Sequence, residues 1–409
     1  MNLVTVTRQQ MLAVLRQLLR RREPVRLGVG VSHHAGNRER LVCPTRSGAD
    51  RNFVLVIDEA FRSDAPLSSR SEGLLTVGRG SWRGQVWGLG AGGERSQIVD
   101  RLKIVGPGMH VLHLPDEGSG PPLVPERWSR TAGALGPDVW RRLTGLSYGV
   151  VGAGRTGSHL VQMLAGMGVS RLVLIDRDTL EKSNLGEMTS VTVADVGRRK
   201  CEAVAHGVSG GCSAETRIEA VPQSVTHVRA LHALQGCDML VSCVDHDGAR
   251  LAATVLSTLF LKPLLDVGVG VHQGRERTRQ LGVDIRLTVP GDRCLLCMGG
   301  LIDEATAVAM LRSPDTEEAL YAARDWRRER AGSLGSLAGL AAALAIRLWE
   351  DFVAERLSGS IWMHAEFDTA GRLSITYPLA APNPTCRLCR FAGFGEEGLL
   401  ATRELLQGR

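Results

Sequence analysis

Short apolar runs that alternate with helical segments dominate the chain beyond residue 127. Mostly apolar runs of four to seven residues, typical of buried strands, occupy 148–151, 171–175, 218–221, 239–244 and 263–269. Between them lie segments with helical spacing, such as 158–166. Strands that are mostly apolar and separated by helices are buried on both faces of a parallel sheet. The pattern predicts an α/β fold with a doubly wound, mostly parallel sheet of Rossmann type.

The first 115 residues carry a different pattern. Residues 8–22 have apolar positions at helical spacing, and short apolar runs separated by Gly, Asn, Asp and Ser follow them. These runs occupy 25–31, 53–57, 74–77, 85–89 and 110–114. We expect a small α+β domain over residues 1–115, a Pro- and Gly-rich linker over 116–126, and the α/β domain over 127–409.

A glycine-rich turn follows the first predicted strand of the α/β domain. Gly152, Gly154 and Gly157 form a G-x-G-x-x-G pattern that opens a predicted helix, and Asp176 ends the next strand. Glycines let the backbone approach a phosphate, the helix N-terminus offers unpaired N–H groups, and the carboxylate is placed for ribose hydroxyls. The pattern indicates a nucleotide site. An NAD-dependent dehydrogenase uses the same turn, and a tight turn without ligand also fits the spacing.

The chain has nine cysteines, and four of them form two Cys-x-x-Cys pairs, Cys294/Cys297 and Cys386/Cys389. This spacing, in a chain without a secretory signal, is typical of a four-thiolate zinc site. A long stretch of sequence separates the pairs, so the ion would tether the C-terminal region to the loop that leaves the sheet. Such a closed site is structural, because it leaves no position for a water molecule. Two disulfides or four free thiols are the alternatives.

Three further motifs follow the glycine turn in a fixed order. They are Asp176-Arg-Asp-Thr-Leu-Glu-Lys-Ser-Asn-Leu185, then Gly197-Arg-Arg-Lys200, then Ser242-Cys-Val-Asp245, and upstream of the turn lies Glu126-Arg-Trp-Ser-Arg130. With the cysteine pairs, this ordered set resembles the ubiquitin-activating-enzyme superfamily, which contains the ThiF-type and MoeB-type adenylyltransferases. The resemblance covers roughly residues 123–395.

The resemblance implies an enzyme, a nucleotidyltransferase that uses ATP and Mg²⁺. Members attach AMP to the C-terminal carboxylate of a small ubiquitin-like or sulfur-carrier protein with a flexible tail. The additional N-terminal domain favours a bacterial ubiquitin-like conjugation pathway. The alternatives are an adenylating enzyme of peptide natural-product biosynthesis and a catalytically impaired nucleotide-binding scaffold or partner subunit.

The resemblance also assigns roles to single residues by motif position. Asp176 would hold the ribose, and Asn184 and Lys200 would contact the phosphates. Asp245, at the end of a predicted strand, would bind Mg²⁺. The resemblance further implies a homodimer, because an arginine of homodimeric members reaches the ATP of the partner subunit. The residues that match it are Arg130 and its neighbour Arg127.

One position departs from the family pattern. The family usually has Asn-Leu-x-Arg after the second strand, and this chain has Asn184-Leu-Gly-Glu187. A carboxylate at this position would repel a triphosphate by Coulomb interaction. A neighbouring guanidinium would compensate, and the candidates are Arg155, Arg198 and Arg199.

Ubiquitin-activating members next move the adenylated tail onto a cysteine, often in the region after the first zinc pair. Residues 298–385 contain no cysteine. The cysteines outside the pairs are Cys43, Cys201, Cys212, Cys237 and Cys243, of which Cys201 and Cys212 are the weak candidates for a thioester. The chain is therefore expected to stop at the acyl-adenylate or to pass it to a thiol-bearing conjugating protein.

Charge and hydropathy exclude other classes. The net charge of +6 is modest, aromatic residues make up 4%, and no recognised nucleic-acid motif is present, so we expect no nucleic-acid partner. The best apolar run, 337–346, is too short to span a bilayer. We expect a cytoplasmic protein without a membrane partner. The histidines at 33, 34, 110 and 113 are expected to be structural, since they lack a metal-ligating arrangement.

Overall fold

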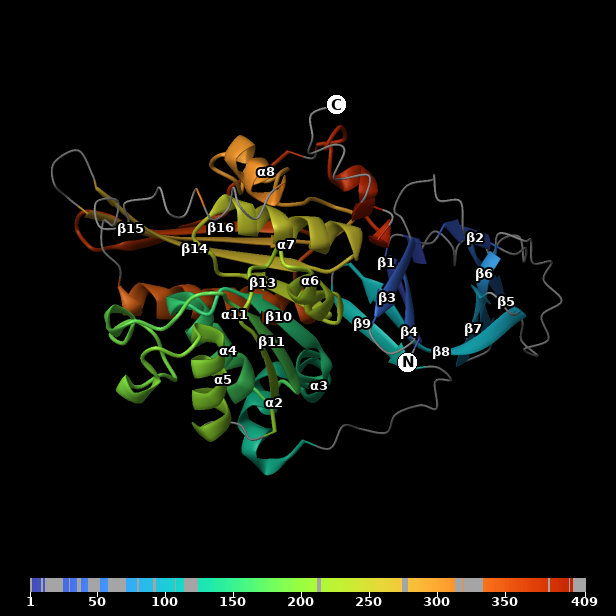
Figure 1. Ribbon diagram of the computed structural model, residues 1–409, viewed down its shortest axis with the longest axis horizontal. Coiled ribbons are helices and arrows are strands. Elements are labelled where there is room, and N and C mark those ends of the chain that lie inside the picture. Colours follow the sequence, from blue (N-terminus) through green and yellow to red (C-terminus); the bar gives the residue numbers. More distant parts are fainter. Residues whose placement is uncertain are drawn as a thin grey trace.

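The protein is described by a computed structural model (Figure 1). It describes residues 2–113 with gaps, 124–211, 215–273, 279–312, 334–381 and most of 383–399. Two β-sheets organise these residues, and the bounds of their strands do not overlap in sequence. The first sheet uses strands before residue 114, and the second uses strands after residue 146.

The N-terminal sheet has nine strands in the described residues, in the order β2-β5-β6-β7-β8-β1-β4-β3, with β9 paired to β8. Its strands are β1 (Asn2–Thr7), β2 (Val25–Gly28), β3 (Gly30–His34), β4 (Arg38–Val42), β5 (Asn52–Ile57), β6 (Ser71–Gly78), β7 (Ser81–Gly90), β8 (Gly93–Val105) and β9 (Met109–His113). Every apolar run predicted here coincides with a strand or a pair of strands. The helix predicted over 8–22 falls mostly on residues outside the described ones.

The second sheet is the α/β sheet that the sequence predicts. Its parallel part has the order β12-β11-β10-β13-β14, and an antiparallel part, β15-β16-β17, extends it. The strands are β10 (Ser147–Val151), β11 (Arg171–Ile175), β12 (Arg217–Val221), β13 (Met239–Ser242), β14 (Leu264–Gln273), β15 (Arg279–Thr288), β16 (Ile361–Phe367) and β17 (Leu373–Thr376). The mostly parallel, doubly wound architecture is thus confirmed.

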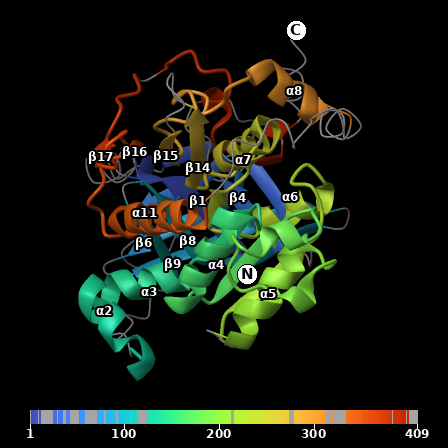
Figure 2. The ribbon, with the colours of Figure 1, turned by 90° about the vertical axis from the view of Figure 1, so that its left-hand side faces the viewer.

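Helices cover both faces of this sheet and bury a separate apolar core on each. One core includes Tyr148, Leu174 and Ile285 of the sheet, and the other includes Val173 and Leu240. The first face carries α3 (Pro137–Gly145), α4 (Arg155–Gly166), α5 (Lys200–Gly211) and α11 (Gly335–Val353). The second carries α6 (Val228–Gln235), α7 (Asp247–Leu259) and, on α7, α8 (Glu304–Arg312). Figures 1 and 2 show α8 and α11 on opposite sides of the β14–β16 end of the sheet.

The N-terminal sheet docks at the amino ends of the parallel strands. Lys103 of β8 is buried, and its ammonium donates to the Asp238 carboxylate at 3.1 Å. Asp238 also accepts from the backbone N–H and the hydroxyl of Ser147, the first residue of β10. Burial alone would raise the pKa of Asp238, but Lys103 and the Ser147 donors lower it. This contact lies at the amino ends of the strands and does not involve their carboxyl ends.

A second contact between the two sheets centres on Glu355, just after α11. Its carboxylate accepts from Arg8 at 2.9 Å and from Arg142 at 3.2 Å, and His110 Nε2 lies 2.8 Å from it. His110 is therefore paired with a carboxylate, which agrees with the structural role expected from the sequence.

In the part of the chain that is described, no helix combines the length and apolar character needed to cross a bilayer.

Candidate nucleotide site and cysteine cluster

The strand order places a ligand site at the carboxyl ends of β10 and β13. From β10 the chain proceeds to β11 and β12 on one side, and it then returns to β13 on the other side. The loops after β10 and β13 therefore diverge at a topological switch point. Ligands of open α/β sheets bind at this position.

The predicted glycine turn connects β10 to α4, and two of its three glycines have a steric reason. Gly152 has φ of 96°, and a Cβ there would lie 2.8 Å from the Cys243 carbonyl oxygen. A Cβ on Gly157 would lie 1.9 Å from the Gly152 carbonyl oxygen. Gly154 precedes α4, and no side chain caps the helix. The N–H groups of the first turn are thus left for an anion.

Asp176, directly after β11, connects this turn to the second strand. Its carboxylate accepts from the Ala153 N–H at 2.7 Å and from the Asp178 N–H at 2.8 Å. Burial raises the pKa of Asp176 to about 6, against the opposing charge of Lys200. The carboxylate thus lies beside the glycine turn, and its role in holding a ribose stays a prediction.

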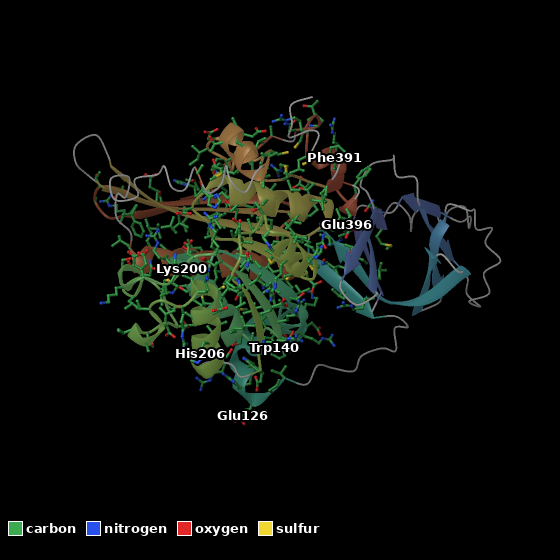
Figure 3. All side chains as sticks on the ribbon, viewed as in Figure 1. Glu126, Trp140, Lys200, His206, Phe391 and Glu396 are labelled. Atoms are coloured by element: carbon green, nitrogen blue, oxygen red, sulfur yellow. The ribbon has the colours of Figure 1, made fainter. Side chains whose placement is uncertain are left out.

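Lys200, labelled in Figure 3, is the first residue of α5, and its ammonium has carboxylates as neighbours. Its ammonium donates to Asp178 at 2.8 Å. Burial alone would lower the pKa of Lys200, but the charges of Asp176, Asp178 and Asp245 raise it. The structure therefore brings Asp176, Lys200 and the exposed Asp245 together at one site. Sequence reasoning missed Asp178, whose signal was only its position two residues after Asp176.

Asn184 and Glu187 follow Asp176 on the same side. The Asn184 side-chain oxygen accepts from the Glu181 N–H at 2.9 Å and caps the short helix η2 (Lys182–Asn184). Glu187 forms an ion pair with Arg155 at 3.3 Å. Of the three compensating arginines considered, Arg155 is therefore the one that faces Glu187. Arg198 instead pairs with Asp195 at 3.1 Å, and Arg199 donates to the Arg177 carbonyl oxygen at 2.7 Å.

Arg127 and Arg130 lie at the opposite end of α4. Trp128, between them in sequence, donates its indole N–H to the carbonyl of Gly166, the last residue of α4. The helix has 12 residues, so its ends are about 18 Å apart. Arg127 pairs with Glu215 at 3.8 Å, and Arg130 is exposed. Figure 3 shows the neighbouring Glu126 well separated from Lys200. The structure does not bring these two arginines to the site of their own chain.

The four paired cysteines form one cluster. The Cys294 sulfur lies 3.7 Å from those of Cys297 and Cys386, and the Cys297 and Cys389 sulfurs are 3.6 Å apart. All four ligand atoms lie within 4.8 Å of one another. Zinc–sulfur bonds of about 2.3 Å in a tetrahedron place the sulfurs about 3.8 Å apart, whereas a disulfide needs about 2.05 Å. The donor set and its spacing thus fit a zinc ion.

The cysteines outside the cluster offer no reactive thiol within the described residues. Cys201 is fully buried and donates to the Asp176 carbonyl oxygen at 3.3 Å. Burial raises the pKa of Cys201 to about 12 and also raises that of Cys243. Cys237 is buried. A buried thiol with a raised pKa is a poor nucleophile, so Cys201 is not suited to carry a thioester. Cys43 and Cys212 lie outside the described residues.

Sequence reasoning also missed a buried polar group beside the site. Asp266 lies within β14, next to Ser242 of β13, and is 1% exposed. The Arg250 Nε lies 3.6 Å from its carboxylate, and Arg286 is its neighbour on β15. Burial raises the pKa of Asp266, against the charge of Arg250. The only signal in the sequence was one charged residue within the otherwise apolar run 263–269, and hydrophobic periodicity does not show that such a residue is buried.

Fold and site together define a class. A doubly wound sheet carries a glycine turn and acidic side chains at its switch point, and a four-cysteine cluster adjoins the core on the α7 face. This is the architecture of a nucleotide-binding α/β protein. The ThiF family model matches residues 128–388, and the chain belongs to this family.

Curated relatives agree with this assignment. The chain is 34% identical over 131 residues to a sulfur carrier protein adenylyltransferase of Thermus thermophilus, covering 32% of this chain and 48% of the relative. It is 29% identical over 164 residues to a SAMP-activating enzyme E1 of Haloferax volcanii, covering 40% and 57%. The chain thus spans about half the length of these relatives.

Solved structures show the same fold. The crystal structure of E. coli MccB with ATP has a TM-score of 0.50 and 20% identity, covering 65% of this chain and 75% of MccB. MccB in complex with N-formylated MccA has a TM-score of 0.52 and 19% identity, covering 64% and 75%. At this identity the likeness concerns the fold alone.

Proposed function

We propose that this chain uses ATP to adenylate the C-terminal carboxylate of a small ubiquitin-like or sulfur-carrier protein, in a bacterial ubiquitin-like conjugation pathway. One observation carries the proposal. In a ThiF-family domain, the glycine turn, Asp176, Lys200 and Asp245 lie close together at the carboxyl ends of the parallel strands. The names of the relatives from Thermus and Haloferax support the substrate class.

The reaction needs positioning and charge neutralisation more than covalent help from the protein. A carboxylate oxygen of the carrier attacks the α-phosphorus of ATP. The bond from this phosphorus to the bridging oxygen of the β-phosphate breaks, and pyrophosphate leaves. The first turn of α4 and Lys200 would bind phosphates, Asn184 would donate its amide to them, and Asp176 would hold the ribose. Asp245 would hold Mg²⁺, which neutralises phosphate charge when bound.

Arg130, with Arg127 as the neighbouring candidate, would complete the site of a second copy. Both arginines lie about the length of α4 from the glycine turn of their own chain, so only a homodimer would bring them to ATP. The role proposed for the N-terminal region is recognition of a partner or completion of the dimer.

The cysteine cluster would hold a structural Zn²⁺. Its four sulfurs leave no open position, and it joins the loop after β15 to the segment after β17. Cys201 is buried and its thiol pKa is raised, so we expect the acyl-adenylate to pass directly to a thiol of a downstream conjugating protein.

ATP–pyrophosphate exchange tests the proposal. With a β-grasp protein ending in Gly-Gly as the carrier, the wild type should exchange label, and Asp245→Ala should lose more than about 100-fold of the rate because it lacks the metal ligand. Asp245 is exposed, so the variant should keep its melting temperature. Full exchange by a folded Asp245→Ala variant would refute the metal assignment.

Two other functions remain candidates. The likeness to MccB, solved with ATP and with N-formylated MccA, supports the same chemistry on a short peptide. A peptide ending in a free carboxylate should then replace the carrier in the exchange assay. A nucleotide-binding scaffold was suggested by Glu187, and it would bind ATP without any exchange. The Arg155–Glu187 ion pair favours the enzyme over the scaffold, because the guanidinium offsets part of the charge of the carboxylate.

A further inference from the structure

Glu187 introduces negative charge into a site that must bind a triphosphate. Asp176, Asp178 and Asp245 already cluster there around Lys200, whose ammonium is committed to Asp178. The Lys200 side chain is only 15% exposed. A phosphate entering this edge therefore meets these carboxylates beside a largely covered ammonium, so a further positive side chain would strengthen its binding in addition to Mg²⁺.

Arg155 supplies a guanidinium at the appropriate place. It is the first residue of α4, directly after Gly154 of the phosphate-binding turn. Side chains in a helix tilt toward its N-terminus, so a residue in the first turn projects past the end where an anion binds. The Arg155 side chain is 43% exposed, and a guanidinium has five N–H donors. One of its terminal nitrogens, NH1, faces Glu187 at 3.3 Å.

Glu187 is held in place by the segment around it. Its N–H donates to the Asn184 carbonyl oxygen at 3.1 Å. Two residues later, the Thr189 N–H donates to the Ser158 hydroxyl at 3.1 Å, and this hydroxyl donates to the Arg155 carbonyl oxygen at 2.9 Å. The first turn of α4 and the segment 184–189 are thus joined by an ion pair and by hydrogen bonds, which restricts the Arg155 side chain.

We infer that Arg155 binds the phosphate oxygens of ATP and that Glu187 is a positioning residue that orients this guanidinium. The inference rests on the proposed function, since it assigns two further residues to the same nucleotide site. The Glu187 carboxylate by itself repels phosphate, but its ion pair holds in place an arginine that has further N–H donors for phosphate oxygens.

Calorimetric titration of Mg²⁺-ATP into the full chain tests the inference. Arg155→Gln should weaken ATP binding by about tenfold or more, because charge-assisted hydrogen bonds to phosphate are lost. Its affinity should also depend less steeply on salt, a readout that a merely structural role would not move. Arg155→Lys keeps the positive charge but not the planar guanidinium, so its affinity for ATP should lie between those of the wild type and Arg155→Gln.

Glu187 is tested by a double-mutant cycle. Glu187→Ala should weaken ATP binding about threefold or more in the wild type, but in Arg155→Gln it should leave binding unchanged or tighten it, because the carboxylate then only repels phosphate. The control is Arg347→Ala: this arginine is 47% exposed, pairs with Glu350 and Asp351 on α11, and should leave ATP binding unchanged.

Several outcomes would overturn the inference. They are wild-type affinity in Arg155→Gln, tighter ATP binding in Glu187→Ala, or an equal effect of Glu187→Ala with and without Arg155. Wild-type protein that binds ATP but performs no exchange would refute the adenylation proposal and leave the Arg155 result valid. Wild-type protein that does not bind ATP would refute both.

Discussion

At the scale of single residues, Asp176 performs two tasks. Its carboxylate accepts from the Ala153 and Asp178 N–H groups and so fixes the glycine turn against the second strand. In the proposed complex its outer lone pairs would accept from ribose hydroxyls. Both tasks require the ionised form, yet burial raises the pKa to about 6. The nucleotide site is therefore predicted to be pH-sensitive.

ATP affinity should fall as the pH is lowered through about 6, because the Asp176 carboxyl then binds a proton before ATP binds. Calorimetric titrations between pH 5 and 8 would measure this. Asp176→Asn serves as the control, since it reports the contribution of the nucleotide's own ionisation. Parallel pH profiles in the two proteins would contradict the assigned role.

The same shift has a consequence for stability. A carboxyl whose pKa is higher in the folded than in the unfolded state stabilises the fold below its unfolded pKa of about 3.9. That stabilisation is lost as the pH rises through about 6. Sequence alone identified Asp176 through its motif, but it gave no sign of the raised pKa, because burial depends on the packed structure.

At the scale of elements, the parallel strands were predicted and their antiparallel extension was not, although residues 281–288 of β15 alternate apolar with polar or small residues. Each predicted strand of 148–269 coincides with an observed one, since central strands are apolar on both faces. β17 alternates apolar and polar residues, but it has only four residues and all are exposed, so it forms no buried apolar run. The 337–346 run was judged only as too short for a membrane, whereas α11 covers Gly335–Val353 and fills a core with Trp349 and Phe352.

The cysteine cluster joins the loop after β15 to the segment after β17, so loss of a cysteine should lower the stability of the fold as well as the zinc content. Cys297→Ser should lower the zinc content by about one equivalent and the melting temperature by roughly 5–10 °C, because metal binding contributes to folding. Metal analysis and thermal unfolding measure both. Cys237→Ser, at a buried cysteine outside the cluster, should keep its zinc. Unchanged stability of Cys297→Ser would disprove the tether.

At the scale of the whole molecule, the α/β domain has two distinct ends. Its carboxyl strand ends carry the candidate site, and its amino ends carry the N-terminal sheet through Lys103 and Asp238. The contact between Lys103 and Asp238 was not predictable, because a long-range pair between a strand and a distant loop leaves no periodic signal in the sequence. Arg127 and Arg130 were found by motif, but only the structure shows that α4 separates them from the site.

A homodimer with arginines acting across the interface predicts complementation. Arg130→Ala and Asp245→Ala should each be impaired in exchange, and an equal mixture should recover about a quarter of wild-type activity, since half of the dimers then contain one intact site. A mixture of Lys200→Ala and Asp245→Ala is the matched control and should recover nothing, because both residues belong to the same site. Failure of the first mixture, with dimers that exchange subunits, would rule out the action of Arg130 in trans.

The most direct test of the central claim is a crystal structure with ATP and Mg²⁺. Density should show the triphosphate along the turn from Gly152 to Gly157, the ribose on Asp176 and the metal ion at Asp245. An empty site at saturating ATP, or NAD bound there in preference to ATP, would contradict the account.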